Sequence, residues 1–295
     1  MKHLSSIFLT LVLFAFSSCK KDDFESEDIG PIVEQDVTFL KHEIVALNVI
    51  KDVFVSGQQV CFHDSLFSIN STDNSIQITK DSLSNLDSMK IKINYGNNLI
   101  LCKDGKFRSG FIQFAFKKNL SFTDSTNKIK VLLNNYRTDT LLINGIQTFT
   151  NSGRINDTLT WQINSSLLMT TNNAKNITFT GNHSIKLKNT QNAFVGYNQP
   201  LSFTLAQFLV DGVSSGTNIN QASYRSYLSN DVEFGYSCVS DTVYSKLLSF
   251  TKGYSNYQLI GLISQTNNYI VYGNGECDRS YMLKSQGYTL IGNFR

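Results

Sequence analysis

A serine flanked by glycines offers the first candidate for chemistry. Residues 212–216 read Gly-Val-Ser-Ser-Gly and match the G-x-S-x-G pattern of an activated nucleophile, with Ser214 at the centre. Such a serine lies on a sharp turn between a strand and a helix, and an activating histidine follows along the chain. The polar run after Gly216 is a poor start for a helix, and no histidine follows His183. We therefore interpret the segment as a Gly/Ser loop and predict no nucleophilic catalysis.

Acidic side chains suggest two other kinds of site. Two carboxylates that face each other across strands can hydrolyse glycosides, and Glu233, Glu276 and Asp278 are candidates without local support. The segment Glu276-Cys277-Asp278 also follows a glycine-rich stretch and offers oxygen ligands for calcium, but it lacks the ligand ladder of an EF-hand. We predict no catalytic residue, no cofactor and no metal site, and we interpret this segment as a turn tied by a disulfide.

Cys19 carries the strongest chemical signal. Lys2 and His3 precede an apolar run at 4–16, which is short for a membrane-spanning helix, and the small residues Ser17 and Ser18 then lead to Cys19. This order resembles the lipobox of bacterial lipoproteins, in which the cysteine is acylated with fatty acids such as palmitate after the signal peptide 1–18 is removed. Phe16 departs from the more common leucine. The alternative is an ordinary secretory signal with an incidental cysteine.

The residues after Cys19 suggest where the protein is exported. Lys20-Lys21-Asp22-Asp23 resembles the start of many Bacteroidota lipoproteins, where such a cluster directs export to the cell surface. We expect a lipid-anchored protein of the outer membrane, displayed on the cell surface, with 19–33 as a flexible acidic tether. The alternative is that the cluster is only a solvated tether. A lipid anchor makes the membrane the first expected partner.

Four further cysteines follow in the exported part of the chain. Cys61, Cys102, Cys238 and Cys277 form an even set, which predicts two disulfides in an oxidising compartment. We prefer Cys61–Cys102 and Cys238–Cys277, although all three connectivities stay open. Cys61 and His63 also suggest zinc, but no C-x-x-C or H-x-x-x-H pattern accompanies them.

The elements that must position these residues are mostly strands. Residues 34–56 show helical spacing of apolar side chains, and Gly57 is a natural stop. From 89 onward apolar and polar residues alternate, as around Trp161, which predicts antiparallel strands with one buried face. Asn144-Gly145 is a hairpin-type turn. We predict one domain at 34–295, mainly β, with a large curved antiparallel sheet and one N-terminal helix packed on it; a two-layer β-sandwich is the alternative.

Composition excludes one class of partner. The formal net charge is only +3, and the lysines are scattered without a basic block among aromatic residues. This pattern is not that of a nucleic-acid-binding protein, so we predict no nucleic-acid partner.

Three segments together resemble a known family. They are CKDGKFRSGFIQFAF (102–116), LLINGIQTFTNSG (141–153) and IVYGNGECDRS (270–280). They are similar to segments of a family of Bacteroidota outer-membrane lipoproteins with a single β-rich domain after a lipobox signal peptide. Lys106, Glu276 and Arg279 depart from the residues usual at those positions. The resemblance implies a β-rich domain with ordered cysteines, and it implies no catalytic residue.

A repeated triplet suggests modification. Asp followed by Ser or Thr and then by an aliphatic residue, Met or Thr resembles the O-glycosylation signal of exported Bacteroidota proteins. The alternative is that an Asp in a turn often precedes a strand that starts with Ser or Thr. The candidate acceptors are Ser65, Ser82, Ser88, Ser125, Thr140, Thr158 and Thr242.

These observations lead us to expect an envelope lipoprotein with a non-enzymatic structural or binding role. One alternative is an accessory protein that binds a glycan or another polymer, for which exposed tyrosines would be the platform. The other alternative is a carrier that holds a hydrophobic ligand within the curved sheet. An envelope protein is a further possible partner.

Overall fold

The computed structural model describes residues 31–63, 75–81, 88–102, 106–117, 120, 124–138, 141–155, 158–188, 207–235, 249–260, 268–274, 280–285 and 288–293, and side chains within helix α2 from Leu40 to Val60. The chain divides into two compact units, Met1–Glu34 and Gln35–Arg295. The sheet and all but the first four residues of α2 belong to the second unit.

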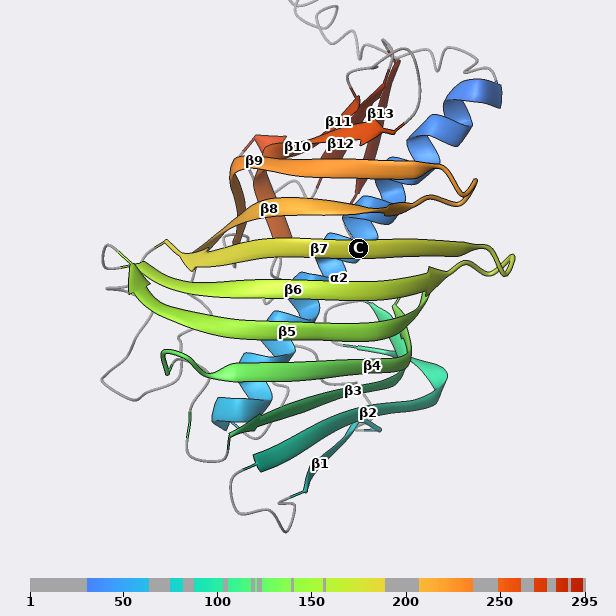
Figure 1. Ribbon diagram of the computed structural model, residues 1–295. Coiled ribbons are helices and arrows are strands. Elements are labelled where there is room, and N and C mark those ends of the chain that lie inside the picture. The colour runs from blue at the N-terminus through green and yellow to red at the C-terminus, as the bar shows by residue number, and fades with distance from the viewer. Residues whose placement is uncertain are drawn as a thin grey trace, which may run out of the picture. The chain divides into compact units, whose positions relative to one another are not determined.

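One antiparallel sheet dominates the second unit (Figure 1). In the described residues it has thirteen strands, and each strand pairs with the strands next to it in sequence. The predicted fold class, a large curved sheet with one N-terminal helix, is confirmed, and the sandwich alternative is not what forms. The strands are β1 Gln77–Asp81, β2 Ser88–Leu101, β3 Phe107–Lys117, β4 Lys128–Thr138, β5 Leu141–Ile155, β6 Thr158–Thr170, β7 Asn176–Leu187, β8 Gln207–Thr217, β9 Ser223–Gly235, β10 Ser249–Leu259, β11 Asn268–Asn274, β12 Ser280–Ser285 and β13 Tyr288–Asn293.

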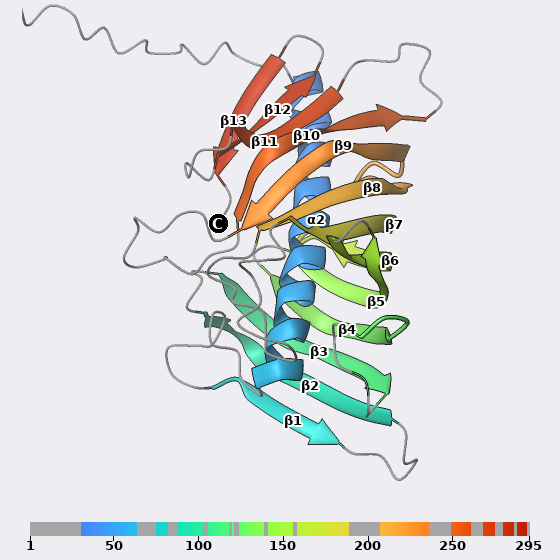
Figure 2. The same cartoon turned by 90° about the vertical axis from the view of Figure 1, so that its left-hand side faces the viewer.

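The helix α2, Pro31–His63, crosses the strands on the concave side of the sheet (Figure 2). The helix is longer at both ends than the predicted 34–56: it begins at Pro31, within the predicted tether, and it continues past Gly57 to His63. Every side chain at 51–60 is buried. Burial of this segment within the curved sheet outweighs the roughly 1 kcal/mol that a glycine costs inside a helix. In the described ranges, no helix combines the length and the apolar character that a membrane crossing requires.

Aromatic side chains join the helix to the sheet. The Phe54 ring is fully buried, and its centroid lies 5.1 Å from that of Trp161, 5.6 Å from that of Phe208 and 6.0 Å from that of Phe149. The alternating pattern had placed Trp161 on the buried face, and this is confirmed. The core therefore occupies the concavity of the sheet, and the opposite face of the sheet is left outside it.

Asn144-Gly145 is not the predicted hairpin turn. Both residues lie inside β5, opposite Leu168 and Leu167 of β6. Gly145 has a φ of 154°, and a Cβ there would lie 2.2 Å from the backbone oxygen of Ser166. The glycine is therefore needed because two backbones approach closely there. An Asn-Gly pair looks the same in the sequence whether it forms a hairpin turn or allows such an approach inside a strand.

Candidate functional site

The outer face of the sheet, which points away from α2, carries small polar side chains in its centre. Alternation places Thr148 on β5 opposite Asn164 on β6, and Asn164 opposite Asn182 on β7. A neighbouring row runs from Ser166 on β6 through Thr180 on β7 to Ser215 on β8 and Arg225 on β9. Strand pairing thus brings residues from five strands into an array of hydroxyl and amide groups.

A hollow of about 780 Å³ lies over this array. Ser165, Gly181 and Ser214 line it although all three are buried and the two serine side chains face inward, so their backbone forms part of its floor. The exposed side chains of Ile146 and Ile260 also line it, with exposed fractions of 57% and 59%. Short side chains in the middle and longer ones at the margin produce the depression.

A second hollow of about 690 Å³ adjoins the first, because Asn182 and Val213 line both. Lys186 and Lys188 are among the residues that line this second hollow. Together the two hollows form one depression over β5 to β9, which we call the outer groove. Five neighbouring strands give it a width of about 19 Å across the sheet, from an inter-strand spacing of ~4.8 Å.

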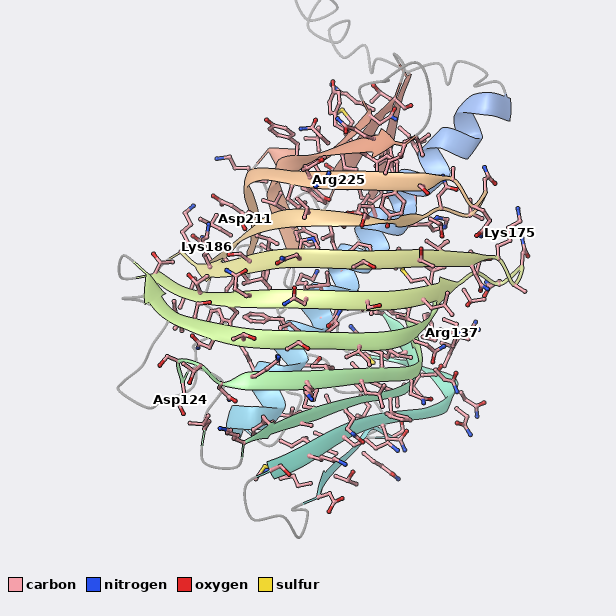
Figure 3. All side chains as sticks on the ribbon, in the orientation of Figure 1. Asp124, Arg137, Lys175, Lys186, Asp211 and Arg225 are labelled. Carbon is pink, nitrogen blue, oxygen red and sulfur yellow. The ribbon has the colours of Figure 1, made fainter. Side chains whose placement is uncertain are left out.

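Ion pairs occupy the margin of the second hollow. The Lys186 Nζ lies 2.6 Å from Asp211 Oδ2, and the Lys188 Nζ lies 2.8 Å from Glu233 Oε1. Figure 3 shows Lys186 and Asp211 together near one end of their strands. Asp124, Arg137 and Lys175 also lie near strand ends, but at other places on the sheet. The lysines of the second hollow are therefore each paired with a carboxylate.

Among the described residues that line the first hollow, Arg225 is the one with a charged side chain. Its guanidinium carbon lies 4.8 Å from the centroid of the Tyr227 ring, a cation–π arrangement. Among the described residues no carboxylate lies within 4.0 Å of it, in contrast to Lys186 and Lys188. The outer groove thus has an exposed guanidinium whose ionic hydrogen bonds remain available.

Ser184 is a second polar group of the groove, and its hydroxyl has no partner among the described residues. It lines the second hollow, lies between Gln162 and Asp211 in the strand register and is only 7% exposed. Its Oγ makes no hydrogen bond to any described residue. A buried hydroxyl without a partner costs free energy unless a bound molecule or water satisfies it.

Ser214 lies below the groove, on the inner face. It is in the middle of β8, so the interpretation of its segment as a loop is wrong. Its Oγ donates a hydrogen bond to Glu43 Oε1 of α2 at 2.5 Å, and its side chain is buried. Burial raises the pKa of Glu43 to about 7, although the hydroxyls of Ser214, Ser226 and Tyr224 oppose that rise.

Sequence reasoning missed Glu43, although a signal for it existed. It stands three residues after Leu40 and four before Leu47, within the apolar stripe of the helix. A carboxylate at such a position must find hydrogen-bond partners in the core. It faces a row of buried polar residues on the inner face, in which Ser214 lies opposite Ser226 and Ser226 lies opposite Tyr257.

A buried ionic cluster joins the other part of the helix to the sheet. Asp52 Oδ2 lies 3.0 Å from Lys106 Nζ and 3.1 Å from Arg108 Nη2, and Arg108 Nε donates to Tyr136 Oη at 3.2 Å. Burial alone would raise the pKa of Asp52, but the two cations outweigh it and hold the pKa well below its usual range. This cluster ties α2 to β3 and does not line the groove.

Four tyrosines that the glycan-binding alternative would use, Tyr224, Tyr227, Tyr254 and Tyr257, are divided between core and surface. Tyr224 and Tyr257 are buried and stack with centroids 4.9 Å apart. Tyr254 is 48% exposed, and Tyr227 is half-buried beside Arg225. Among the described residues that line the two hollows none is a tyrosine, and Tyr227 is near the groove only through its contact with Arg225.

The remaining predicted sites fall mostly outside the described residues. Cys102 is buried, and the disulfides stay a prediction because Cys238, Cys277 and the side chain of Cys61 lie outside the description, as does Cys19. Ser88 and Thr158 begin strands and are half-buried, and Ser125 is exposed in the turn before β4. Ser65, Ser82, Thr140 and Thr242 lie outside the description.

No three His, Cys, Asp or Glu side chains in the described ranges lie together as a metal-binding group. Of the suggested carboxylates, Glu233 pairs with Lys188, and Glu276 and Asp278 lie outside those ranges. Comparisons of the chain with models of protein families, with curated proteins and with solved structures found no match.

Proposed function

We propose that this protein is a non-enzymatic binding protein of the cell envelope, anchored in the outer membrane through lipid on Cys19, and that the outer groove binds a glycan. The observation that carries the proposal is the groove itself. It is a depression of two adjoining hollows whose centre presents hydroxyl and amide groups from neighbouring strands.

The chemistry of these groups suits sugar hydroxyls. Ser and Thr hydroxyls can donate and accept hydrogen bonds, and the Asn amide does both through separate atoms. Asn164, Thr180 and Asn182 are exposed and lie on adjacent strands, so they can bond to one chain laid across the sheet. A wide shallow groove, open to solvent, suits a polymer better than a small enclosed ligand.

The same geometry argues against the hydrophobic carrier. The concave face, where an apolar ligand would lie, packs on α2 through the Phe54 ring. A ligand there would have to displace a helix whose side chains at 51–60 are all buried. The outer groove is therefore the better-supported binding surface.

The experiment removes hydroxyls from the groove without changing its shape. We expect the Thr180→Val, Ser215→Ala double variant to bind polysaccharides about tenfold or more weakly, since each hydrogen bond contributes about 1 kcal/mol. Affinity electrophoresis in gels that contain mannan, xylan, β-glucan or polygalacturonate measures the binding.

The matched control is Thr79→Val with Ser152→Ala, two exposed positions that do not line either hollow. It should bind as the wild type does. The proposal fails if none of the polymers retards the wild-type protein, or if the groove variant and the control behave alike.

A further inference from the structure

Charge in the groove is uneven. Among the described residues that line the two hollows, the charged ones are Arg225, Lys186, Lys188 and Asp211. Asp211 neutralises Lys186, and Glu233 neutralises Lys188 from the margin. The positive charge of Arg225 remains, and it faces the hollow with the uncharged hydroxyl groups.

A contact within β9 also orients the Arg225 side chain. The half-buried Tyr227 ring supports the guanidinium plane from the same strand. In the strand register Arg225 lies opposite Ser215 on one side and Gln258 on the other, so polar groups surround it. A guanidinium supported in this way can form two parallel hydrogen bonds with one carboxylate, which an ammonium group cannot do.

We infer that the outer groove selects an acidic polysaccharide, in which a uronate carboxylate pairs with Arg225 while neighbouring sugar hydroxyls bond to the floor. This inference rests on the proposed glycan-binding function and adds the class of glycan. The Oγ of Ser184 in the adjoining hollow, which has no hydrogen-bond partner in the described part of the chain, is a second group that such a polysaccharide can satisfy. A neutral glycan would leave the charge of Arg225 without a counterpart in the complex.

The test compares one polymer in two charge states. Polygalacturonate carries a carboxylate on each sugar, and its methyl ester keeps the same backbone without the charge. We expect the wild type to bind the acid about tenfold more tightly than the ester, the factor expected of a hydrogen-bonded charge pair. Arg225→Gln should remove that preference by weakening only the acid complex, and Arg225→Lys should restore part of it.

Lys175→Gln provides the control for net charge. Lys175 is an exposed cation in the turn between β6 and β7, outside both hollows, and its loss changes the net charge by the same amount (Figure 3). It should leave the preference unchanged. Equal losses in Arg225→Gln and Lys175→Gln would show nonspecific attraction and overturn the inference.

Binding to the acid and its ester with equal affinity would overturn the acidic specificity while the glycan-binding proposal stood. If the protein bound neither form nor any neutral polymer, both the proposed function and the inference would fall. The Thr180→Val, Ser215→Ala variant separates the two, because it should weaken binding to both forms, whereas Arg225→Gln should weaken binding only to the acid.

Discussion

At the scale of single residues, Ser214 and Glu43 illustrate how burial gives a reactive type of side chain a structural role. Ser214 is only 3% exposed, and its hydroxyl is hydrogen-bonded to the carboxyl group of Glu43 on α2, so it points away from the groove above. Its backbone contributes to the groove, while its side chain contributes to the core. The pair joins helix and sheet.

Glu43→Gln should change how stability depends on pH. Glu43 has an ordinary pKa of 4.5, and burial raises it to about 7 in the folded protein. Between these values the folded state keeps a proton that the unfolded state releases, so the free energy of unfolding falls as pH rises. We expect the variant to gain up to about 3 kcal/mol relative to the wild type between pH 4.5 and 7.5, measured by urea unfolding at several pH values.

The difference between the pH profiles of the wild type and Glu43→Gln reports the contribution of Glu43 alone. Burial lowers the pKa of both His42 and His183 from 6.5 to about 4, with an opposite effect on the pH dependence. In the interval between those values the unfolded state binds protons that the folded state does not, so these histidines favour folding as pH rises. Both proteins contain them, so their contribution cancels. Parallel pH profiles would contradict the raised pKa.

At the scale of elements, glycines at bulges shape the sheet. The pairing of β3 with β4 shifts between Ser109 and Phe111, and the intervening Gly110 has a φ of 77°. A Cβ there would lie 2.0 Å from the backbone oxygen of Asn135. Bulges increase local twist and bend a strand, which is how a sheet curves around a helix.

Gly110→Ala should therefore destabilise the protein more than Gly96→Ala. Gly96 has a similar φ of 81°, but a Cβ there meets no atom within 4 Å. Both variants incur the left-handed backbone cost of roughly 1–2 kcal/mol, and only Gly110→Ala also forces two backbones apart. We expect an additional loss of about 1–3 kcal/mol from that displacement. Equal unfolding midpoints in urea would show that the close approach is relieved without cost.

At the scale of the whole molecule, the two faces of one sheet have different roles. The concave face packs on α2 and supplies the core (Figures 1 and 2). The outer face carries the groove. A sheet covered on one face by a single helix leaves its other face to solvent. This arrangement fits the binding role proposed above, because the groove lies on a face of the sheet that α2 does not cover.

The proposed anchor and address can be tested in cells. Wild-type protein should fractionate with the outer membrane and be degraded when protease is added to intact cells. Cys19→Ala should leave that fraction, because the protein loses its acyl chains. A periplasmic protein serves as the control for intact cells. Wild-type protein that stays in the outer membrane and resists the protease would contradict surface display.

The sequence by itself determined the main kinds of element and the alternation of buried residues in the strands, but it misplaced the glycine-containing segments 144–145 and 212–216, which lie inside strands. Alternation around Trp161 and helical spacing after 34 are local consequences of backbone geometry, so they predicted a β-rich unit with one N-terminal helix. The extent of the helix beyond Gly57 was not predictable, because packing inside the sheet overrides local propensity.

Only the tertiary structure decided which residues meet. Thr180, Ser215 and Arg225 are neighbours through the register of three strands, and Glu43 bonds to a serine 171 residues away. A shift of register by one residue would move every outward side chain to the inner face. The groove could not be predicted from the sequence, because strand register depends on the packing of the whole sheet and not on any one segment.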